Sequence, residues 1–416
     1  MKKHLLPGVL LLVFAGVITN KIYAEQTRIL WLGNSYVTVN NLPQLFHDLA
    51  LSAGDSVIFD SNAPGGTTLQ QHSVNATSIQ KIYSQPWDYV IVQAQSQEPS
   101  FPPAQVASQT FPYARVLDSL IRDNDSCTQT VFYMTWGKKY GDQQNCGGYP
   151  ILCTFDGVQS RLTESYVQMA NDNDALVAPA GRAWQTSWHT DTLINLWNAD
   201  NSHPNIAGSY LTACVFYGTI FRKSPVGIVY SPISAQITND YLQNIAYHTV
   251  FDTLSNWNIG KFDVKASFEA TATPPTFNFY LWGAANVNSF IWDFGDGTTS
   301  TTSGTHTYAN NGTYTVTLIA FDNCGNSDTA SQIFSVGANA VSAIGEEIFN
   351  LSPNPVMDKL VIDGLANTSV EVLDVTGKSV LKIAIKQEHS ETDVHHLLPG
   401  IYFLKTRTAV KKFLKQ

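Results

Sequence analysis

The chain has few charged residues and no basic excess. Only 14% of its 416 residues are Asp, Glu, Lys or Arg, and the formal net charge is −9 at pH 7. A chain of this charge has no basic face with which to bind the phosphate backbone of DNA or RNA, so we expect no nucleic-acid partner. The hydrophobic content of 44% and the aromatic content of 12% are ample for packed cores.

Long apolar runs are missing beyond the N-terminal segment. Residues 1–24 combine Lys2 and Lys3 with the apolar run 5–18 and the short end 22–24, the three-part layout of a secretory signal peptide. No later segment stays apolar for the roughly 20 residues that a membrane-spanning helix needs. We therefore expect residues 1–24 to be cleaved and the mature chain to be exported without a transmembrane span.

Cysteine is scarce, and the spacing of the five cysteines contains no zinc signature. In an exported chain this number indicates some disulfide bonding, and Cys146 and Cys153 are the nearest pair. Cys127 is either a further participant or a free thiol. Cys214 lies in an apolar run typical of a buried thiol, and Cys324 lies in a different domain.

Residues 25–260 alternate between short apolar runs and segments with helical apolar spacing. Strands are expected at residues 29–32, 56–60, 89–92, 131–135 and 175–178. Helices are expected at residues 42–53, 68–82, 104–122 and 160–171. This alternation predicts an α/β domain with a parallel sheet between helices, in which reactive groups collect at the carboxyl ends of the strands.

Ser35 follows the first expected strand, at the end of a Gly-Asn-Ser stretch. A serine hydroxyl is a poor nucleophile unless a base lies in hydrogen-bond reach and a third group orients that base. Asp200 and His203, three residues apart and followed by a helix-like apolar run, supply both groups. Either motif alone is typical of an ordinary turn or helix cap. Together and in this order they indicate a catalytic Ser35, Asp200 and His203.

These motifs resemble the first and last blocks of the SGNH (GDSL-like) hydrolases. The resemblance implies a flavodoxin-like three-layer domain and ester hydrolysis without metal or organic cofactor. It also implies an oxyanion hole built from the Ser35 amide, a glycine after the second strand and an amide side chain after the third. Gly65 and Gly66 stand in the second position, where ordinary loop glycines are the alternative.

The third block departs from the family pattern, because Gly-x-Asn-Asp is missing. The segment 93–99 reads Gln-Ala-Gln-Ser-Gln-Glu-Pro and resembles a Leu-Gln-Glu-Gln-Ser type variant seen among Bacteroidetes proteins. A glutamine can donate the same amide hydrogen bond as an asparagine. Gln97 stands opposite the family's asparagine and Gln95 is equally placed, while capping of the strand is the alternative role for both.

Two other histidines are rival bases, and a long loop is a candidate cleft wall. His72 and the His189/Asp191 pair lack the Asp-x-x-His-Pro context and rank below His203. The glycine-rich loop 138–155 follows the fourth strand, where such loops usually shape a substrate cleft. Five aromatic side chains offer either sugar-stacking surfaces or core packing: Tyr140, Tyr149, Trp184, Trp188 and Trp197.

Residues 261–337 change to short alternating strands with Thr, Asn and Gly turns, the pattern of a small β-sandwich. Within it Trp-Asp-Phe-Gly-Asp-Gly at 292–297 and His-Thr-Tyr at 306–308 closely resemble the PKD module. Trp292 and Phe294 are expected in the core, with the neighbouring aspartates shaping the turn. The resemblance implies a spacer or a surface or glycan-contacting module.

Residues 345–416 form a third expected unit, a second small all-β sandwich. Leu-Ser-Pro-Asn-Pro-Val at 351–356, the alternating run 370–378, the segment 398–404 and the basic end 411–415 resemble the C-terminal sorting domain of type IX secretion. The resemblance implies a Bacteroidetes source, the type IX secretion machinery as a partner, and a secreted or surface location outside the outer membrane.

The sequence as a whole predicts a secreted serine esterase. An acetyl or other short acyl group on a carbohydrate is the preferred ester, carried either by a small molecule or by a polysaccharide. The alternative from another class is a surface glycan-binding or adhesion protein whose SGNH-like domain is inactive, motivated by the missing Gly-x-Asn-Asp block.

Overall fold

The computed structural model describes residues 26–337, 349–374, 377–406 and 409–415. The expected signal peptide lies outside these residues. The described residues divide into two compact units. The first holds residues 26–265 together with the loops 285–289 and 320–328, and the second holds the other described residues.

The first unit is built on one parallel sheet of five strands in the order β2-β1-β3-β4-β5. The strands are β1 (Thr27–Leu32), β2 (Val57–Asn62), β3 (Tyr89–Val92), β4 (Gln129–Tyr133) and β5 (Leu176–Ala178). The apolar runs of β1, β3 and β4 are buried, as expected for strands covered on both faces. All five strands therefore lie where the sequence predicts them, with end shifts of one or two residues.

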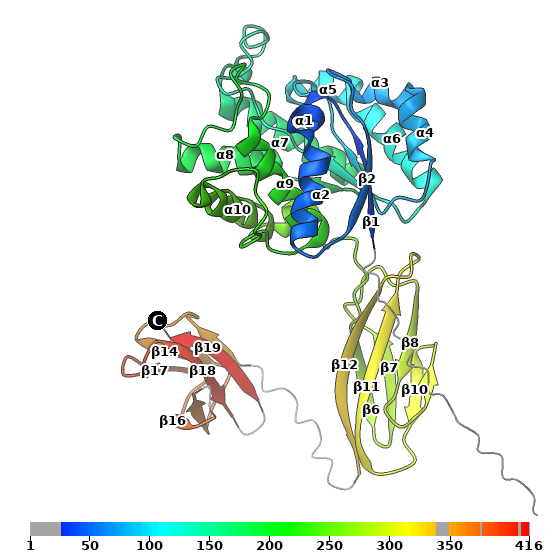
Figure 1. The fold of residues 1–416 in the computed structure, drawn as a ribbon. Helices are drawn as coiled ribbons and strands as arrows, with labels where there is room; N and C mark the ends of the chain where they lie inside the picture. The colour runs from blue at the N-terminus through cyan, green and yellow to red at the C-terminus, as the bar shows by residue number, and fades with distance from the viewer. Residues whose placement is uncertain (1–25, 338–348, 375–376, 407–408, 416) are drawn as a thin grey trace, which may run out of the picture. The chain divides into compact units, whose positions relative to one another are not determined.

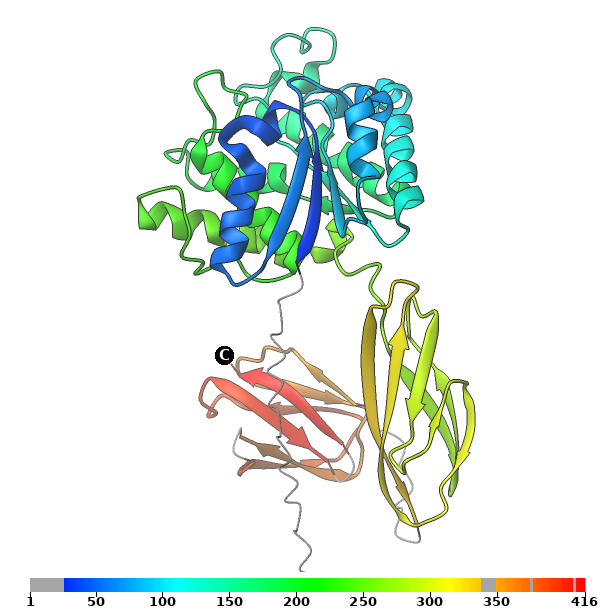
Figure 2. The same ribbon diagram turned by 45° about the vertical axis from the view of Figure 1, so that its right-hand side comes forward.

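Helices cover both faces of this sheet (Figures 1 and 2). On one face α2 (Leu42–Ser52) packs on α9 (Ile206–Phe221), and α8 (Ala180–Thr190) and α10 (Gln236–Phe251) pack on α9. The other face carries α3 (Leu69–Val74), α4 (Ala76–Ile82), α5 (Pro103–Gln109), α6 (Phe111–Asn124) and α7 (Phe155–Asp172). Trp31 of β1 contacts Phe46 and Phe216 edge-on, so α2 and α9 share one core. Short helices are α1 (Ser35–Thr38), η1 (Val39–Asn41), η2 (Glu98–Ser100), η3 (Pro150–Cys153) and η4 (Leu254–Trp257).

Two of the helices expected from the sequence are each divided into two helices in the structure. Both differences from the prediction have a local cause. The helix expected at 68–82 breaks at Asn75, whose extended backbone lets its side chain cap α4 by accepting the Ser78 N–H. The helix expected at 104–122 breaks at Thr110, just before Phe111 and Pro112 begin α6. Proline has no N–H to donate and clashes with the preceding turn, so a helix restarts there more easily than it continues.

The second unit contains two separate pairs of antiparallel sheets. The first pair has the orders β10-β7-β6 and β12-β11-β8-β9. Its strands are β6 (Phe268–Thr273), β7 (Thr276–Leu281), β8 (Ser289–Asp293), β9 (Thr299–Ser300), β10 (Gly304–Thr307), β11 (Gly312–Phe321) and β12 (Ser327–Val336). Trp292 and Phe294 are buried in its core, as predicted. Asp293 and Asp296 accept backbone N–H groups within the intervening turn.

The second pair of sheets has the orders β13-β14-β17 and β16-β15-β18-β19. Its strands are β13 (Asn350–Ser352), β14 (Lys359–Asp363), β15 (Thr368–Leu373), β16 (Ser379–Ile385), β17 (His389–Asp393), β18 (Gly400–Lys405) and β19 (Val410–Lys415). Alternate apolar residues of these strands form its core, including Leu360, Ile362, Val370, Leu404 and Phe413. No helix in the described part of the chain has the length and hydrophobicity that crossing a membrane requires.

Candidate active site

Ser35 is the first residue of α1, three positions beyond the carboxyl end of the interior strand β1. The turn forms here because Asn34 has an extended backbone and its side chain caps α1 by accepting the Tyr36 N–H at 3.1 Å. The Ser35 side chain is thereby presented at the edge of the sheet where ligands of open α/β sheets bind.

Asp200 and His203 come from the loop that precedes α9. The Ser35 Oγ lies 2.9 Å from His203 Nε2, and His203 Nδ1 lies 2.5 Å from Asp200 Oδ2. Asp200 Oδ1 also accepts the N–H of Ser202 and of His203, at 3.0 and 2.9 Å. The structure thus brings the three residues of the sequence hypothesis into one hydrogen-bonded line.

The hydrogen bonds assign the proton positions in this line. The carboxylate of Asp200 is an acceptor, so His203 Nδ1 carries the proton and Nε2 can accept the Ser35 hydroxyl proton. Partial burial raises the pKa of Asp200. The hydrogen bonds from the His203 side chain and from the Ser202 and His203 amides together outweigh this effect and bring the pKa below its ordinary value. Asp200 is therefore ionised at neutral pH and holds the imidazole in the tautomer of a general base.

Three stacked aromatic rings support the catalytic loop, the loop before α9 that carries Asp200 and His203. Tyr36 stacks on Trp136 with 4.9 Å between ring centroids, and Trp136 stacks on Trp184 at 3.6 Å. Two of these rings bond to Ser202: the Tyr36 hydroxyl lies 2.7 Å from Ser202 Oγ, and Trp136 Nε1 donates to Ser202 O at 3.0 Å. Burial raises the pKa of Tyr36 to about 12, so its hydroxyl stays protonated. The loop is fixed one residue before His203.

The residues considered for the oxyanion hole differ in their availability. The backbone N–H groups of Ser35, Gly65 and Gly66 have no acceptor among the residues that the structure describes. Gln95 Oε1 accepts the N–H of Gln97 and that of the next residue, so its oxygen caps the η2 turn. Gln97 Nε2 is buried and has no partner within the described chain, so its amide donor is not committed elsewhere.

The rival bases do not join this line. His72 is buried, with Nε2 bonded to the Gly33 carbonyl and Nδ1 beside the Ser78 hydroxyl, both at 2.8 Å. His189 is exposed and pairs with Asp156 at 2.9 Å rather than with Asp191. Neither histidine is placed to take a proton from Ser35.

Gln93 is a residue of this region that the sequence reasoning missed. It is fully buried at the end of β3, and its Oε1 accepts the N–H of Asn34 at 2.9 Å. Its position as the first polar residue after an apolar strand was a usable signal, since such residues point to the carboxyl edge of the sheet. Gln95 and Gln97, two and four residues later, match the family block more closely and are therefore the residues that the sequence favours.

The loop 138–155 is joined to the catalytic loop by a single backbone contact, the Lys139 N–H to Asn201 O hydrogen bond of 2.9 Å. Lys139 Nζ lies 5.0 Å from the ring centre of Trp188 and bonds to Asn195 Oδ1. Of the five aromatic residues considered for sugar stacking, Trp184 and Trp197 are buried in the core, whereas Tyr140 is 62% exposed. Tyr140 is thus the most accessible ring of this group.

Four of the five cysteines are paired. Cys146 and Cys153 form a disulfide inside the loop 138–155, and Cys127 bonds to Cys324 of the loop 320–328, both within the first unit. Cys214 is a buried free thiol, as its apolar surroundings predict. The pairing of Cys127 with a residue 197 positions away had no signal in the sequence, where Cys324 was assigned to another domain.

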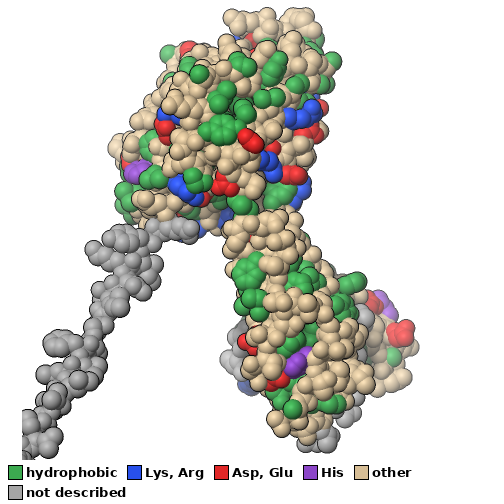
Figure 3. All heavy atoms as spheres, turned by 90° about the vertical axis from the view of Figure 1, so that its right-hand side faces the viewer, with side chains coloured by type: hydrophobic (Ala, Val, Ile, Leu, Met, Phe, Trp, Pro, Cys, Tyr) green, Lys and Arg blue, Asp and Glu red, His purple; other side chains and the backbone are tan. Residues whose placement is uncertain are grey.

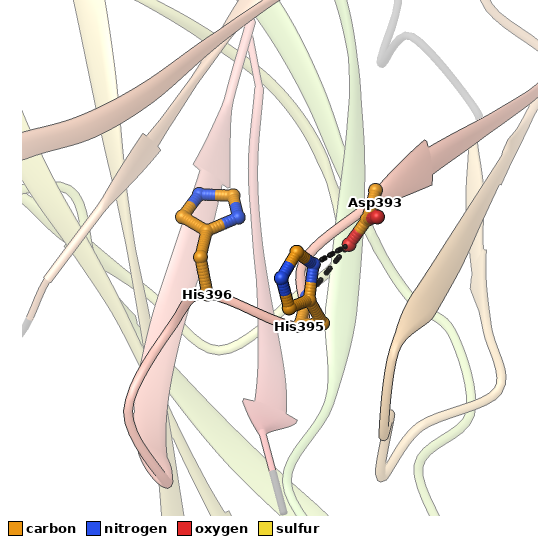
Figure 4. A group of neighbouring side chains, drawn as sticks. All are labelled: Asp393, His395 and His396. Atoms are coloured by element: carbon orange, nitrogen blue, oxygen red, sulfur yellow. Dashed lines mark hydrogen bonds and ion pairs between the residues drawn. The ribbon is translucent and has the colours of Figure 1, made fainter.

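Charged side chains of the described residues also lie outside the candidate active site. On the face of the first unit shown in Figure 3, Lys and Arg side chains lie interspersed with Asp and Glu. Among the described residues one group of potential metal ligands occurs: Asp393 at the end of β17, with His395 and His396 in the loop that follows (Figure 4). All three are exposed, and His395 Nδ1 already bonds to Asp393 at 2.6 Å. We assign no metal to this group.

The sheet order, the serine after β1 and the Asp-x-x-His loop before α9 agree with the SGNH-like fold that the sequence motifs predict for the first unit. Family models match the remainder of the chain in two places. Residues 265–336 match the PKD domain, and residues 350–416 match the secretion system C-terminal sorting domain. Both assignments agree with the motifs in the sequence.

Solved structures similar to the chain include SGNH-type proteins and PKD domains. A DUF4886 family protein from Bacteroides uniformis is 18% identical, with a TM-score of 0.47, over 55% of this chain and 96% of its own. A putative SGNH hydrolase from Slackia heliotrinireducens is 27% identical, with a TM-score of 0.39, over 47% of this chain and 100% of its own. The PKD1 domain of a Vibrio cholerae metalloprotease is 35% identical, with a TM-score of 0.17, over 18% of this chain and 95% of its own. No curated protein sequence matches the chain.

Proposed function

We propose that the first unit is a serine esterase in which Ser35 is the nucleophile, His203 the general base and Asp200 the residue that orients the base. The single observation that carries this proposal is the hydrogen-bonded line from Ser35 Oγ through the two ring nitrogens of His203 to the Asp200 carboxylate. Nucleophile, base and orienting acid are the three parts that acyl transfer by a serine requires.

The proposed reaction has two steps. In the first, Ser35 Oγ attacks the ester carbonyl while His203 Nε2 takes the hydroxyl proton; the tetrahedral intermediate then expels the alcohol, which receives that proton from His203. In the second, His203 takes a proton from water, the resulting hydroxide attacks the acyl-serine, and the acid leaves as Ser35 regains its proton. No metal or organic cofactor enters either step.

The negative oxygen of each intermediate needs fixed hydrogen-bond donors. The Ser35 amide and the amide of Gly65 or Gly66 are free to donate, because no acceptor for them lies among the described residues. The uncommitted Nε2 of Gln97 is the preferred third donor, ahead of Gln95, whose side chain already caps the next turn.

For the substrate, we propose a short acyl group, acetyl by preference, on a carbohydrate. The side chains of His203 and Asp200 remain 34% and 47% exposed, so the alcohol side of the ester meets solvent and can be large. The exposed ring of Tyr140 offers a stacking surface for a sugar. Tyr140 follows Lys139, whose N–H donates to the carbonyl of Asn201 next to Asp200. Export through the sorting domain and an appended PKD module suit a polymer outside the cell.

The sorting domain indicates secretion by the type IX machinery. We propose that residues 345–416 are the segment this machinery recognises, and that the protein reaches the cell surface or the medium after loss of residues 1–24. The PKD domain at 261–337 then serves as a spacer or glycan-contacting module between the esterase and the sorting domain.

The direct test is acetate release by the mature chain from a panel of acetylated polysaccharides and from p-nitrophenyl acetate. We expect release by the wild type and by His189→Asn, a control that removes an exposed histidine paired with Asp156. We expect none above background from Ser35→Ala. Binding of the polysaccharides with no release from any ester would instead support the inactive glycan-binding protein.

A further inference from the structure

The peptide unit between Gly33 and Asn34 immediately precedes the nucleophile, and buried side chains hold both of its polar atoms. His72 Nε2 lies 2.8 Å from the carbonyl oxygen of Gly33. The N–H of Asn34, at the other end of the same peptide plane, donates to Gln93 Oε1 at 2.9 Å. His72 is 1% exposed and Gln93 0% exposed, so water does not compete for either bond.

A chain of hydrogen bonds determines which nitrogen of His72 carries a proton. A carbonyl oxygen can only accept, so Nε2 is the protonated nitrogen and donates to Gly33. Nδ1 then accepts from the Ser78 hydroxyl at 2.8 Å, and Ser78 Oγ in turn accepts from Asn62 Nδ2 at 2.8 Å. Burial lowers the pKa of His72, and the bond to Gly33 raises it by less, so the imidazole is neutral at neutral pH.

The amide of Gln93 is held as firmly as the imidazole. While its Oε1 accepts from Asn34, its Nε2 donates to the carbonyl of Ala94 at 2.5 Å, so exchange of oxygen and nitrogen would break both bonds. Gly33 admits this close approach because it has no side chain. A Cβ at Gly33 would lie 2.6 Å from Gln93 Oε1 and 2.7 Å from Val37 Cγ2, both inside van der Waals contact.

The orientation of this peptide determines the geometry of the groups that follow it. The Asn34 side chain caps α1 through the Tyr36 N–H, and the next peptide along carries the Ser35 N–H, the expected oxyanion donor. A change in the backbone angles at Gly33 or Asn34 that is not compensated along the chain would displace the Ser35 amide and move the Ser35 hydroxyl away from His203. Donors for a developing oxyanion act only when they are fixed before the reaction.

We propose that His72 and Gln93 are positioning residues that clamp the Gly33–Asn34 peptide and thereby hold the Ser35 hydroxyl and amide in place for acyl transfer. The inference rests on the proposed function of Ser35. The two side chains bond to the Asn34 N–H and the Gly33 carbonyl and not to Ser35 or His203, so both act through the backbone of the nucleophile turn.

The test compares His72→Asn with His72→Gln in the mature chain. The amide nitrogen of glutamine reaches the position of Nε2 and can donate to Gly33 O, whereas asparagine is too short. We expect His72→Asn to lower kcat for p-nitrophenyl acetate about 100-fold with KM within about twofold of the wild type, because a misplaced nucleophile affects the transition state more than substrate binding. His72→Gln should recover kcat to within about fivefold.

Thermal unfolding of each variant ensures that the rates refer to folded protein, and His189→Asn controls for the loss of a histidine as such. If His72→Asn does not fold, Ser78→Ala serves instead: it removes the hydroxyl that bonds to Nδ1, and we expect a roughly tenfold lower kcat at unchanged KM.

The outcomes separate the clamp from the esterase. Loss of kcat in the asparagine variant with recovery in the glutamine variant supports the clamp. An active wild type with an equally active His72→Asn, or with glutamine no better than asparagine, overturns the clamp and leaves the esterase standing. A wild type that cleaves no ester overturns the proposed function, and the catalytic role of the clamp falls with it.

Discussion

Ser35 Oγ lies 2.9 Å from His203 Nε2, although 168 residues separate them in the chain. The fold produces this contact because Ser35 follows the carboxyl end of β1, an interior strand of the sheet, and the loop before α9 lies at the same edge. The Trp136 and Tyr36 rings then hold that loop through Ser202. The distance between Ser35 Oγ and His203 Nε2 is therefore set by the packing at the carboxyl edge of the sheet, and neither sequence motif alone determines it.

The first prediction concerns Asp200. Asp200→Asn should lower kcat about 1,000-fold with KM little changed, because the amide can no longer hold Nδ1 protonated and stabilise the imidazolium. The measurement is p-nitrophenyl acetate hydrolysis by the mature chain. Asp191→Asn, from the rejected His189/Asp191 pair, is the matched control and should keep the wild-type rate. Equal rates in the two variants would remove Asp200 from the mechanism.

Gly33→Ala tests how tightly the nucleophile turn is packed. The added methyl would lie 2.6 Å from Gln93 Oε1, so the clamp must open or the strand must shift. We expect a loss of about 1–3 kcal/mol in the free energy of unfolding and a kcat lower by at least about tenfold. Gly65→Ala, where a Cβ meets nothing within 4 Å, is the control for stability. Wild-type unfolding and turnover in Gly33→Ala would show that the turn is not constrained as described.

Glu98 gives a stability change with a defined pH window. Burial raises its pKa to about 7 from an ordinary value of 4.5. Between these two pKa values the folded state binds more protons than the unfolded state, so the free energy of unfolding falls as the pH rises from 4.5 to about 7. The stability that protonated Glu98 contributes is therefore lost above about pH 7. Allowing for partial exposure, the contribution is about 2 kcal/mol.

Glu98→Gln removes this titration. Urea unfolding at pH 5 and at pH 8 measures the effect. Relative to the wild type, we expect the free energy of unfolding of the variant to be higher by about 2 kcal/mol at pH 8 than at pH 5. An unchanged difference between the two proteins at both pH values would mean that Glu98 is ionised in the folded state with no cost.

The two disulfides should differ in their stabilising effect. Cys127–Cys324 closes a separation of 197 residues and Cys146–Cys153 closes one of 7. By loop entropy, replacing the first pair with serine should cost on the order of 5 kcal/mol and replacing the second about 2 kcal/mol. Guanidinium unfolding of the two double variants measures both. A larger loss from the short loop would contradict the entropic explanation.

The sequence predicted the strands well because their apolar runs are short and bounded by polar residues. The runs of β1, β3, β4 and β5 are buried, whereas β2 at the edge of the sheet is partly exposed. The prediction failed where a single residue interrupts a continuous pattern. The apolar spacing through Asn75 and through Thr110 reads as one helix in each case, and only the backbone shows that Asn75 is extended and that Pro112 starts a new helix.

The candidate triad was accessible from sequence because serine, aspartate and histidine occur in short motifs of defined order. The support around it was not, since it depends on long-range contacts between residues of unremarkable type. Gln93 bonds to Asn34 from 59 positions away, and His72 bonds to Gly33 from 39. From its sequence context His72 is predicted only as a rival base. The partner of Cys127 was equally out of reach, because disulfide pairing follows spatial proximity rather than spacing.

The most direct test of the account is to identify the residue that a fluorophosphonate probe modifies in the mature chain. We expect mass spectrometry to find one adduct on Ser35 in the wild type, a strongly reduced labelling rate in His203→Ala, no adduct in Ser35→Ala, and loss of ester hydrolysis in parallel. Ester hydrolysis that persists in Ser35→Ala, or a probe adduct on another residue with Ser35 unmodified, would contradict the assignment of Ser35 as the nucleophile.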